Sequence, residues 1–95
     1  RAGVIGFMTV TLHIPQARSL KDKRQVVKSL VDTVRRKFNV SVAEIEDMDL
    51  HQRATLGIAC VSNDQAHAHR VLEAVREAIE GNAEAIGCEV AMEML

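Results

Sequence analysis

Aromatic residues are nearly absent from this sequence. Its 95 residues include no tryptophan, no tyrosine and two phenylalanines, so aromatics make up 2% of the chain. Domains that recognise RNA on the face of a β-sheet stack bases on aromatic rings. Only Phe7 could offer such a ring, because Phe38 falls in a predicted helix. A conventional RNA-recognition sheet is therefore excluded, and any contact with RNA is expected from a helix.

Cysteine and long hydrophobic runs are also scarce. Cys60 and Cys88 are the only cysteines, fewer than a small secreted protein needs when disulfides stabilise it. We expect both to be reduced and to behave as small buried hydrophobic residues. The apolar runs are far shorter than the roughly 20 residues that cross a bilayer, and no signal-peptide pattern is present. We therefore expect a cytoplasmic protein that does not contact membranes.

The sequence has no motif of catalytic or metal-binding chemistry. We find no nucleophile beside a base, no paired carboxylates at an obvious separation and no glycine-rich phosphate loop. His67 and His69 lie two residues apart in a predicted helix, so their side chains point about 200° apart and do not easily share a metal. A closed set of four metal ligands is missing. We predict no catalytic residue, no cofactor and no metal site.

One polar segment leaves an enzymatic alternative open. Residues 47–53 contain Asp47, Asp49, His51 and Arg53 in a predicted connection between two strands. Such clusters are typical of solvated turns. A deep pocket that gathered Asp49, His51 and Arg53 would favour an enzyme instead.

Composition and hydrophobic periodicity predict one α+β domain over residues 1–95. Hydrophobic residues make up 47% of the chain and charged residues 26%, as in folded domains of this size. Alternating apolar residues predict strands over 4–14, 40–46, 53–61 and 88–95. Helical spacing predicts one helix from a cap at Ser19 to about Phe38, closed by Asn39 in the left-handed conformation, and another from a cap within 62–64 to Gly81. Right-handed crossovers then give a two-layer βαββαβ sandwich with antiparallel sheet order 4-1-3-2.

Several motifs between residues 19 and 64 carry a family resemblance that covers essentially the whole chain. They are SLKDKR at 19–24, VVKSL at 26–30, RRKFNVSVAE at 35–44, DLHQRA at 49–54, LGIA at 56–59 and VSND at 61–64. In these motifs the chain resembles the bacterial YlxP-like family of uncharacterised proteins. The resemblance implies a ferredoxin-like fold and no established activity, and gene neighbours of that family imply work near RNA or ribosomes. Where the family usually has an aromatic residue before Gln-Arg-Ala, this chain has His51.

Charge is distributed unevenly although the net charge is only −1. Residues 18–37 contain eight basic residues and two acids, whereas residues 39–95 contain three basic residues and eleven acids. At 100° per residue, four cations of the first helix fall within about 60° of one another. We define the basic ridge as these four with the preceding Arg18: Arg18, Lys21, Arg24, Lys28 and Arg35. Such a ridge suits the phosphates of RNA, although solvated charged faces are common.

Two functions therefore remain open. The first is a noncatalytic accessory domain that binds RNA or a ribosome-associated partner through the basic ridge. The second is a homodimeric interaction module without a nucleic-acid role, because one sheet face is predicted to expose small residues to a second copy. An antiparallel sheet can equally leave that face in water. The residues of this predicted dimer face are Phe7, Thr9, Thr11, Thr55, Gly57 and Ala59.

Overall fold

The computed structural model describes residues 2–82 and 85–95. Six elements follow one another as β1 (Val4–His13), α1 (Leu20–Lys37), β2 (Ser41–Glu46), β3 (Arg53–Ser62), α2 (Gln65–Glu80) and β4 (Ile86–Met94). The predicted βαββαβ order is confirmed. The largest boundary difference is at β4, which begins two residues before the predicted start because Ile86 already pairs with His13 beyond an irregularity in the β1–β4 register.

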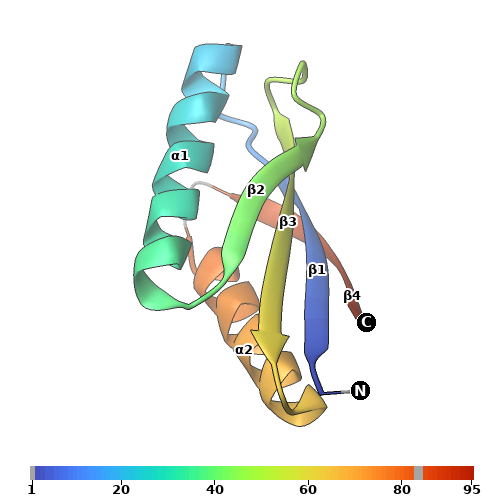
Figure 1. The fold of residues 1–95 in the computed structure, drawn as a ribbon. Helices are drawn as coiled ribbons and strands as arrows, with labels where there is room; N and C mark the ends of the chain where they lie inside the picture. Colours follow the sequence, from blue (N-terminus) through green and yellow to red (C-terminus); the bar gives the residue numbers. More distant parts are fainter. Residues whose placement is uncertain (1, 83–84) are drawn as a thin grey trace.

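The four strands form one antiparallel sheet in the order β2-β3-β1-β4. This is the predicted order 4-1-3-2 counted from the other edge. The two central strands, β1 and β3, pair along their full ten-residue length, from Val4 opposite Ser62 to His13 opposite Arg53. The shorter strand β2 and the C-terminal strand β4 form the two edges (Figure 1).

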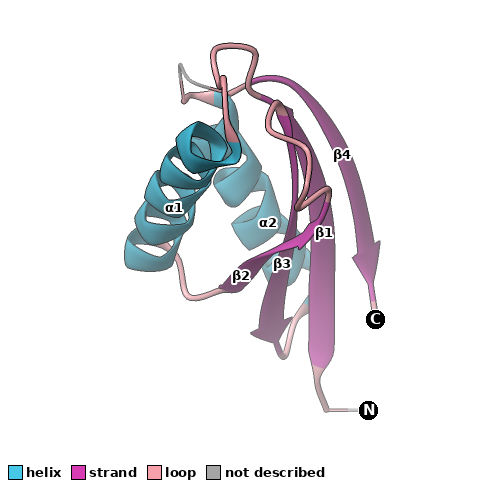
Figure 2. Ribbon diagram, turned by 90° about the horizontal axis from the view of Figure 1, so that it is seen from above, coloured by secondary structure: helices cyan, strands magenta, loops and turns pink. Residues whose placement is uncertain are grey.

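Both helices cover the same face of the sheet (Figure 2). Helix α1 packs against β2 and β3, whereas α2 packs against β1, β3 and β4. No helix of the described part of the chain lies on the opposite side, which we call the open face. Side chains alternate along a strand, so Gly6, Met8 and Val10 point toward the helices, and Ile5, Phe7 and Thr9 point to the open face.

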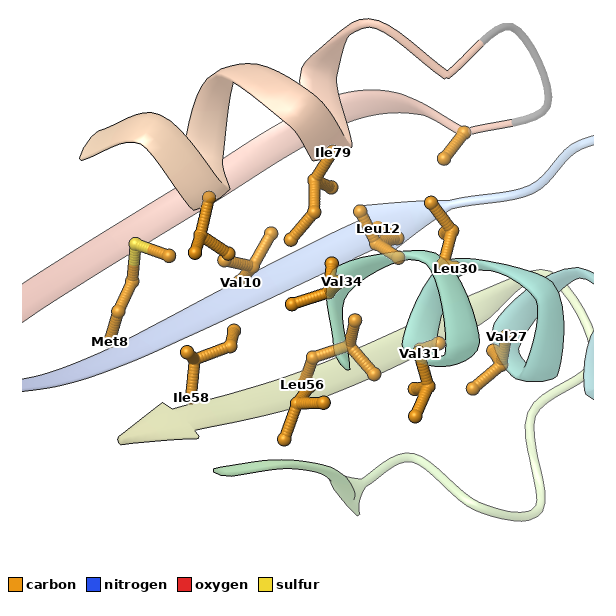
Figure 3. Packing of buried hydrophobic residues seen from close by; sticks show 14 of the residues in the cluster. Met8, Val10, Leu12, Val27, Leu30, Val31, Val34, Leu56, Ile58 and Ile79 are labelled. Carbon is orange, nitrogen blue, oxygen red and sulfur yellow. The ribbon is translucent and has the colours of Figure 1, made fainter. Parts of the chain in front are cut away.

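The hydrophobic core fills the space between the sheet and the helices (Figure 3). Met8, Val10 and Leu12 of β1 have at most 1% of their surface exposed. They meet apolar side chains from β3, α1 and α2, among them Leu56, Ile58, Leu30, Val34 and Ile79. Each fully buried aliphatic side chain of this kind contributes roughly 1.5–3 kcal/mol relative to exposure. This single core holds α1 in the orientation that decides which of its residues face water.

The helix ends agree with the sequence prediction except at one terminus. Ser19 caps α1, because its Oγ accepts a hydrogen bond from the backbone N–H of Asp22 at 3.1 Å, and Asp64 caps α2. The left-handed conformation predicted for Asn39 is wrong. The C-cap of α1 is Phe38 with extended backbone (φ −132°, ψ 144°), and Asp47 is the one non-glycine residue with positive φ in the described chain. From Phe38 the extended chain leads through Val40 into β2, which begins at Ser41.

Candidate nucleic-acid interface

The basic ridge lies on the outward side of α1. Its four helical members and Arg18 are all exposed to solvent. Because a helix rises about 1.5 Å per residue, the ridge extends roughly 21 Å from Lys21 to Arg35. The predicted cations therefore share one accessible side of one rigid helix.

Lys28 is partly neutralised within its own helix. Its Nζ lies 3.0 Å from Asp32 Oδ2, one turn further on, and the two side chains are 79% and 51% exposed. An exposed pair of this kind contributes little to stability and is easily exchanged for another partner. Asp32 nevertheless lowers the positive potential in the middle of the ridge.

Arg35 has a structural contact. Its Nη2 donates a hydrogen bond of 2.8 Å to the backbone carbonyl of Val42 in β2. Since β2 is an edge strand, this contact satisfies a main-chain acceptor that would otherwise face water. Arg35 thus connects the last turn of α1 to the sheet, and its guanidinium is less available than the other members of the ridge.

Lys21 and Arg24 are the most available cations. Neither has an ion-pair partner among the described residues, and no other element brings a carboxylate to them. Arg36 and Lys37 are also exposed in the last turn of α1. The helix therefore presents cations at both ends, with the Lys28–Asp32 pair between them.

Lys23 differs from every other cation of α1 because none of its surface is exposed. Its Nζ donates to Glu44 Oε2 at 2.9 Å and to the carbonyl of Asp47 at 2.8 Å. Two further carbonyls, those of Arg53 and Met48, lie at 3.2 and 3.4 Å. Burying a charge is costly unless it is paired and hydrogen-bonded, and four oxygen acceptors surround this one. Lys23 therefore belongs to the fold and adds nothing to the ridge.

Sequence reasoning missed this role of Lys23, although the signal was present. At 100° per residue, Lys23 falls about 20° from Leu30 and Val34, inside the apolar stripe of α1. A lysine in such a stripe needs an anionic or carbonyl partner from another element. The partners come from β2, the β2–β3 connection and β3, more than twenty residues away in sequence.

Asp47 organises the connection between β2 and β3. Its Oδ2 accepts hydrogen bonds from Thr55 Oγ1 at 2.6 Å and from Arg53 Nε at 3.0 Å. The Thr55 hydrogen bond, followed by the hydrogen bond and charge of Arg53 and the charge of Lys23, outweighs partial desolvation and lowers the pKa of Asp47. With φ of 63°, Asp47 adopts the left-handed conformation that aspartate tolerates better than most residues. The segment predicted as a solvated turn is thus held by a polar network.

Gln52 fixes a second loop to the same connection. Its Nε2 donates to the carbonyls of Pro15 and Ala17, at 3.0 and 3.2 Å. The backbone carbonyl of Gln52 accepts a hydrogen bond of 2.9 Å from the backbone N–H of Ile14. These contacts position the β1–α1 loop and therefore Arg18 at the start of the ridge. Ala54, which completes the Gln-Arg-Ala triplet, is fully buried.

The predicted dimer face is more enclosed than its small residues suggest. Gly57 and Thr55 are buried, and Phe7, Thr9, Thr11 and Ala59 are partly buried. Ile45 and Phe7 extend over Gly57, since a Cβ at that position would lie 3.1–3.2 Å from Ile45 and 3.4 Å from Phe7. Exposed apolar residues at this face are instead Ile5, Val61 and Leu95, at 45%, 78% and 52%.

The residues of the enzymatic alternative do line one surface depression, together with His13, Leu50 and Gln52. Asp49 and His51 are exposed there, whereas Arg53 is held by Asp47.

Among the described residues no group of three His, Cys, Asp or Glu side chains could hold a metal ion. In the same part of the chain no helix is long and apolar enough to span a membrane. Cys60 is buried with a free thiol, and Cys88 lies outside the side chains that the structure describes.

The element order, the sheet order and the two helices on one face define a ferredoxin-like domain. Residues 5–92 match the model of a family described as "Protein of unknown function (DUF503)", and the chain belongs to that family. A relative in Bacillus subtilis (strain 168), "Uncharacterized protein YlxP", is 42% identical over 72 residues, which cover 76% of this chain and 78% of the relative. The family carries no established activity in its description.

Solved structures support the same fold. The designed protein Foldit4 superposes with a TM-score of 0.59 at 15% identity, over 98% of this chain and 96% of that chain. The designed ferredoxin-fold protein LFR1 1 gives 0.51 at 18% identity, over 99% and 85%. A C-terminal segment of the alpha subunit of aIF2 from Pyrococcus abyssi gives 0.51 at 18% identity, over 95% of this chain and 49% of that chain. At these identities the likeness concerns the fold alone.

Proposed function

We propose that this protein is a noncatalytic accessory domain that binds RNA through the outward side of α1. The observation that supports this proposal best is that Lys21 and Arg24 are exposed and have no carboxylate partner among the described residues. Arg18 and Lys28 extend the same surface, and Arg36 and Lys37 add charge at its end. Cations on a rigid helix contact phosphates and release counterions, which gives affinity with little choice of sequence.

The distribution of acids over the rest of the chain agrees with such a one-sided interaction. The acids of α2 and β4, including Glu73, Glu80, Glu89 and Glu93, lie on elements other than α1. A polyanion is therefore attracted to α1 and repelled elsewhere. A ribosome-associated acidic protein is the alternative ligand of the same surface.

The noncatalytic part of the proposal is supported by how the polar residues are used. Lys23, Asp47, Arg53 and Thr55 bind one another, so their side chains are engaged within the fold. The remaining polar residues of the surface depression, Asp49 and His51, are open to solvent and form no ion pair among the described residues. A catalytic group is normally oriented by a partner.

The test replaces the three ridge cations of α1 that do not support the sheet. We expect the variant Lys21→Gln/Arg24→Gln/Lys28→Gln to lose most of its affinity for a fluorescent RNA in an anisotropy titration. If all three contact phosphates, the slope of log K against log salt concentration falls by roughly 2. Arg35 is left unchanged because its contact with Val42 is structural.

The matched control carries the same loss of three positive charge units on α2. Gln65→Glu/Ala66→Glu/Arg70→Gln changes three exposed residues and should bind RNA almost as the unaltered protein does. Equal binding by the ridge variant and the control would refute the proposal. A second test captures binding partners from nuclease-treated and untreated lysate. Partners that are captured equally from both would favour an acidic protein over RNA as the ligand.

A further inference from the structure

Three exposed apolar residues form a row across the open face at one end of the sheet. Val61 lies opposite Ile5 in the β1–β3 register, and Ile5 exchanges two backbone hydrogen bonds with Leu95, at 3.1 and 2.7 Å. The exposed fractions are 45% for Ile5, 78% for Val61 and 52% for Leu95. We call these three residues the apolar row. Isolated exposed hydrophobic residues are common, but a contiguous row on an uncovered sheet indicates an interaction surface.

The rest of the open face is smooth and mostly uncharged. The next levels of the sheet present Ala59 beside Phe7, and then Ala43, Gly57, Thr9 and Ala91 side by side. Ile45 and Phe7 fill the space above Gly57. The acids on this face lie at its two edges. Glu89 and Glu93 of β4 lie opposite Thr11 and Phe7, and on the β2 side Glu46 lies opposite Thr55, whose hydroxyl donates to Asp47.

We propose that the open face binds the open face of a second copy of this chain, with a two-fold axis parallel to β1 and β3. Two sheets packed face to face keep their strands roughly aligned about 10 Å apart. A four-stranded face of this length measures roughly 20 by 30 Å, so two copies bury about 1,200 Å² in total. That area reaches the lower limit of specific protein interfaces.

Charge does not distinguish the two ways in which the faces could meet. An axis parallel to the strands places β4 over β2 of the second copy, so Glu93 meets Ser41 and Glu89 meets Glu46. An axis perpendicular to the strands places β4 over β4, with Glu89 opposite a second Glu93. Each axis therefore brings acids together at the edges of the face, where like charges are costly.

The apolar row favours the parallel axis. The parallel axis lays β1 over β3 at the same level, so Val61 lies close to Ile5 of the second copy and apolar surface meets apolar surface. The perpendicular axis places the apolar row against Arg53 and His13, at the other end of the sheet. Burying that guanidinium beside alkyl groups would cost free energy.

This arrangement leaves the basic ridge free. Both helices lie on the side of the sheet away from the open face, so the dimer has four layers with α1 of each copy on opposite outer surfaces (Figure 2). The two interactions are therefore independent. A dimer would present two basic helices, and one RNA long enough to reach both would bind with increased avidity.

The test uses two complementary variants and sedimentation velocity over a wide range of concentration. We expect the unaltered chain to sediment with twice the mass of one chain. Val61→Asp and Ile5→Lys should each sediment as monomers, because each buries a charge against an apolar side chain. When the two variants are mixed, the introduced carboxylate of one chain meets the introduced ammonium group of the other, and the double mass should return.

The control is Met48→Asp, an equally polar change at an apolar residue that is 52% exposed in the β2–β3 connection. It should leave the dimer intact, and circular dichroism should show that every variant is folded. A concentration-independent monomer, or a dimer that survives Val61→Asp, would overturn the proposal. Failure of the mixed variants to pair would overturn the parallel axis.

Discussion

The ammonium group of Lys23 lies 2.9 Å from Glu44 Oε2, and the lysine side chain has no exposed surface whereas that of Glu44 is 19% exposed. This pair joins α1 to β2 at the level where the chain leaves the sheet for the β2–β3 connection. The carbonyls of Asp47 and Arg53 complete the surroundings of the charge. One residue of a basic helix therefore adds a polar connection to the apolar packing that holds that helix on the sheet.

Lys23→Met should destabilise the fold strongly. The methionine fits the apolar stripe but leaves Glu44 and three carbonyl oxygens without their shared donor. Removing one member of a buried pair costs about 3 kcal/mol or more, and we expect a loss of this size in the free energy of unfolding. Urea denaturation followed by circular dichroism measures this loss as a lower midpoint at an unchanged slope.

Lys21→Met is the matched control. It makes the same chemical change two residues away, at an exposed position of the same helix. Surface substitutions of this kind stay within about 0.5 kcal/mol of the parent. Equal unfolding midpoints for the two variants would show that the buried network does not stabilise the fold.

Ser19→Ala tests the cap that fixes where α1 begins. The hydroxyl oxygen accepts a hydrogen bond of 3.1 Å from the backbone N–H of Asp22. Losing this hydrogen bond should lower the free energy of unfolding by about 1 kcal/mol. Ser29→Ala, in the exposed middle of α1, should be neutral or slightly stabilising because alanine has the higher helix propensity. If Ser29→Ala were the more damaging of the two in urea denaturation, the assigned cap would be incorrect.

Gln52→Glu should loosen the β1–α1 loop. The substitution replaces a donor with an acceptor facing the carbonyls of Pro15 and Ala17, so two hydrogen bonds become repulsive contacts. We expect a loss of about 1–2 kcal/mol in the free energy of unfolding. Amide hydrogen exchange should also become faster at residues 16–18. Gln25→Glu, the same change at an exposed position of α1, should affect neither quantity.

Much of the fold follows from local sequence. The alternation in β1, the apolar stripe of α1 and the single proline after β1 are each visible in the sequence, and they predict the elements and the sheet order correctly. The end of α1 shows the limit of that reasoning. Asn39 has the right residue type for a left-handed cap, but Phe38 closes the helix in extended form, because the chain must already run toward β2 at Ser41.

The sites were less predictable because they depend on pairings between distant residues. Periodicity places Lys21, Arg24 and Lys28 correctly on one exposed side of α1. It does not reveal that Arg35 donates to Val42 or that Asp47 accepts from Thr55, since those contacts require the packing of α1 on β2 and the shape of the connection. The exposed row of Ile5, Val61 and Leu95 likewise requires the strand register and the pairing of Ile5 with Leu95.

Thr55→Val should raise the pKa of Asp47 toward its usual value of 3.8. The hydroxyl of Thr55 is the largest cause of the lowered pKa, and valine keeps the shape and β propensity of threonine while removing the donor. A carboxyl-detected NMR titration measures the change directly. Arg53 and Lys23 remain, so the pKa should stay somewhat lowered, and an unchanged pKa would contradict the role of Thr55.

The lowered pKa also gives stability a definite pH dependence. Because Asp47 is more acidic in the folded chain than in the unfolded chain, its ionised form stabilises the fold at pH values above 3.8, the usual value. That contribution is lost as the pH falls below 3.8 toward the lower folded-state pKa. Asp47→Asn, which still tolerates the left-handed conformation, should therefore be less stable than the parent at neutral pH, and the difference should shrink in acid. A difference in urea midpoint that stays constant from neutral to acidic pH would show that the Asp47 carboxylate does not support the connection through its charge.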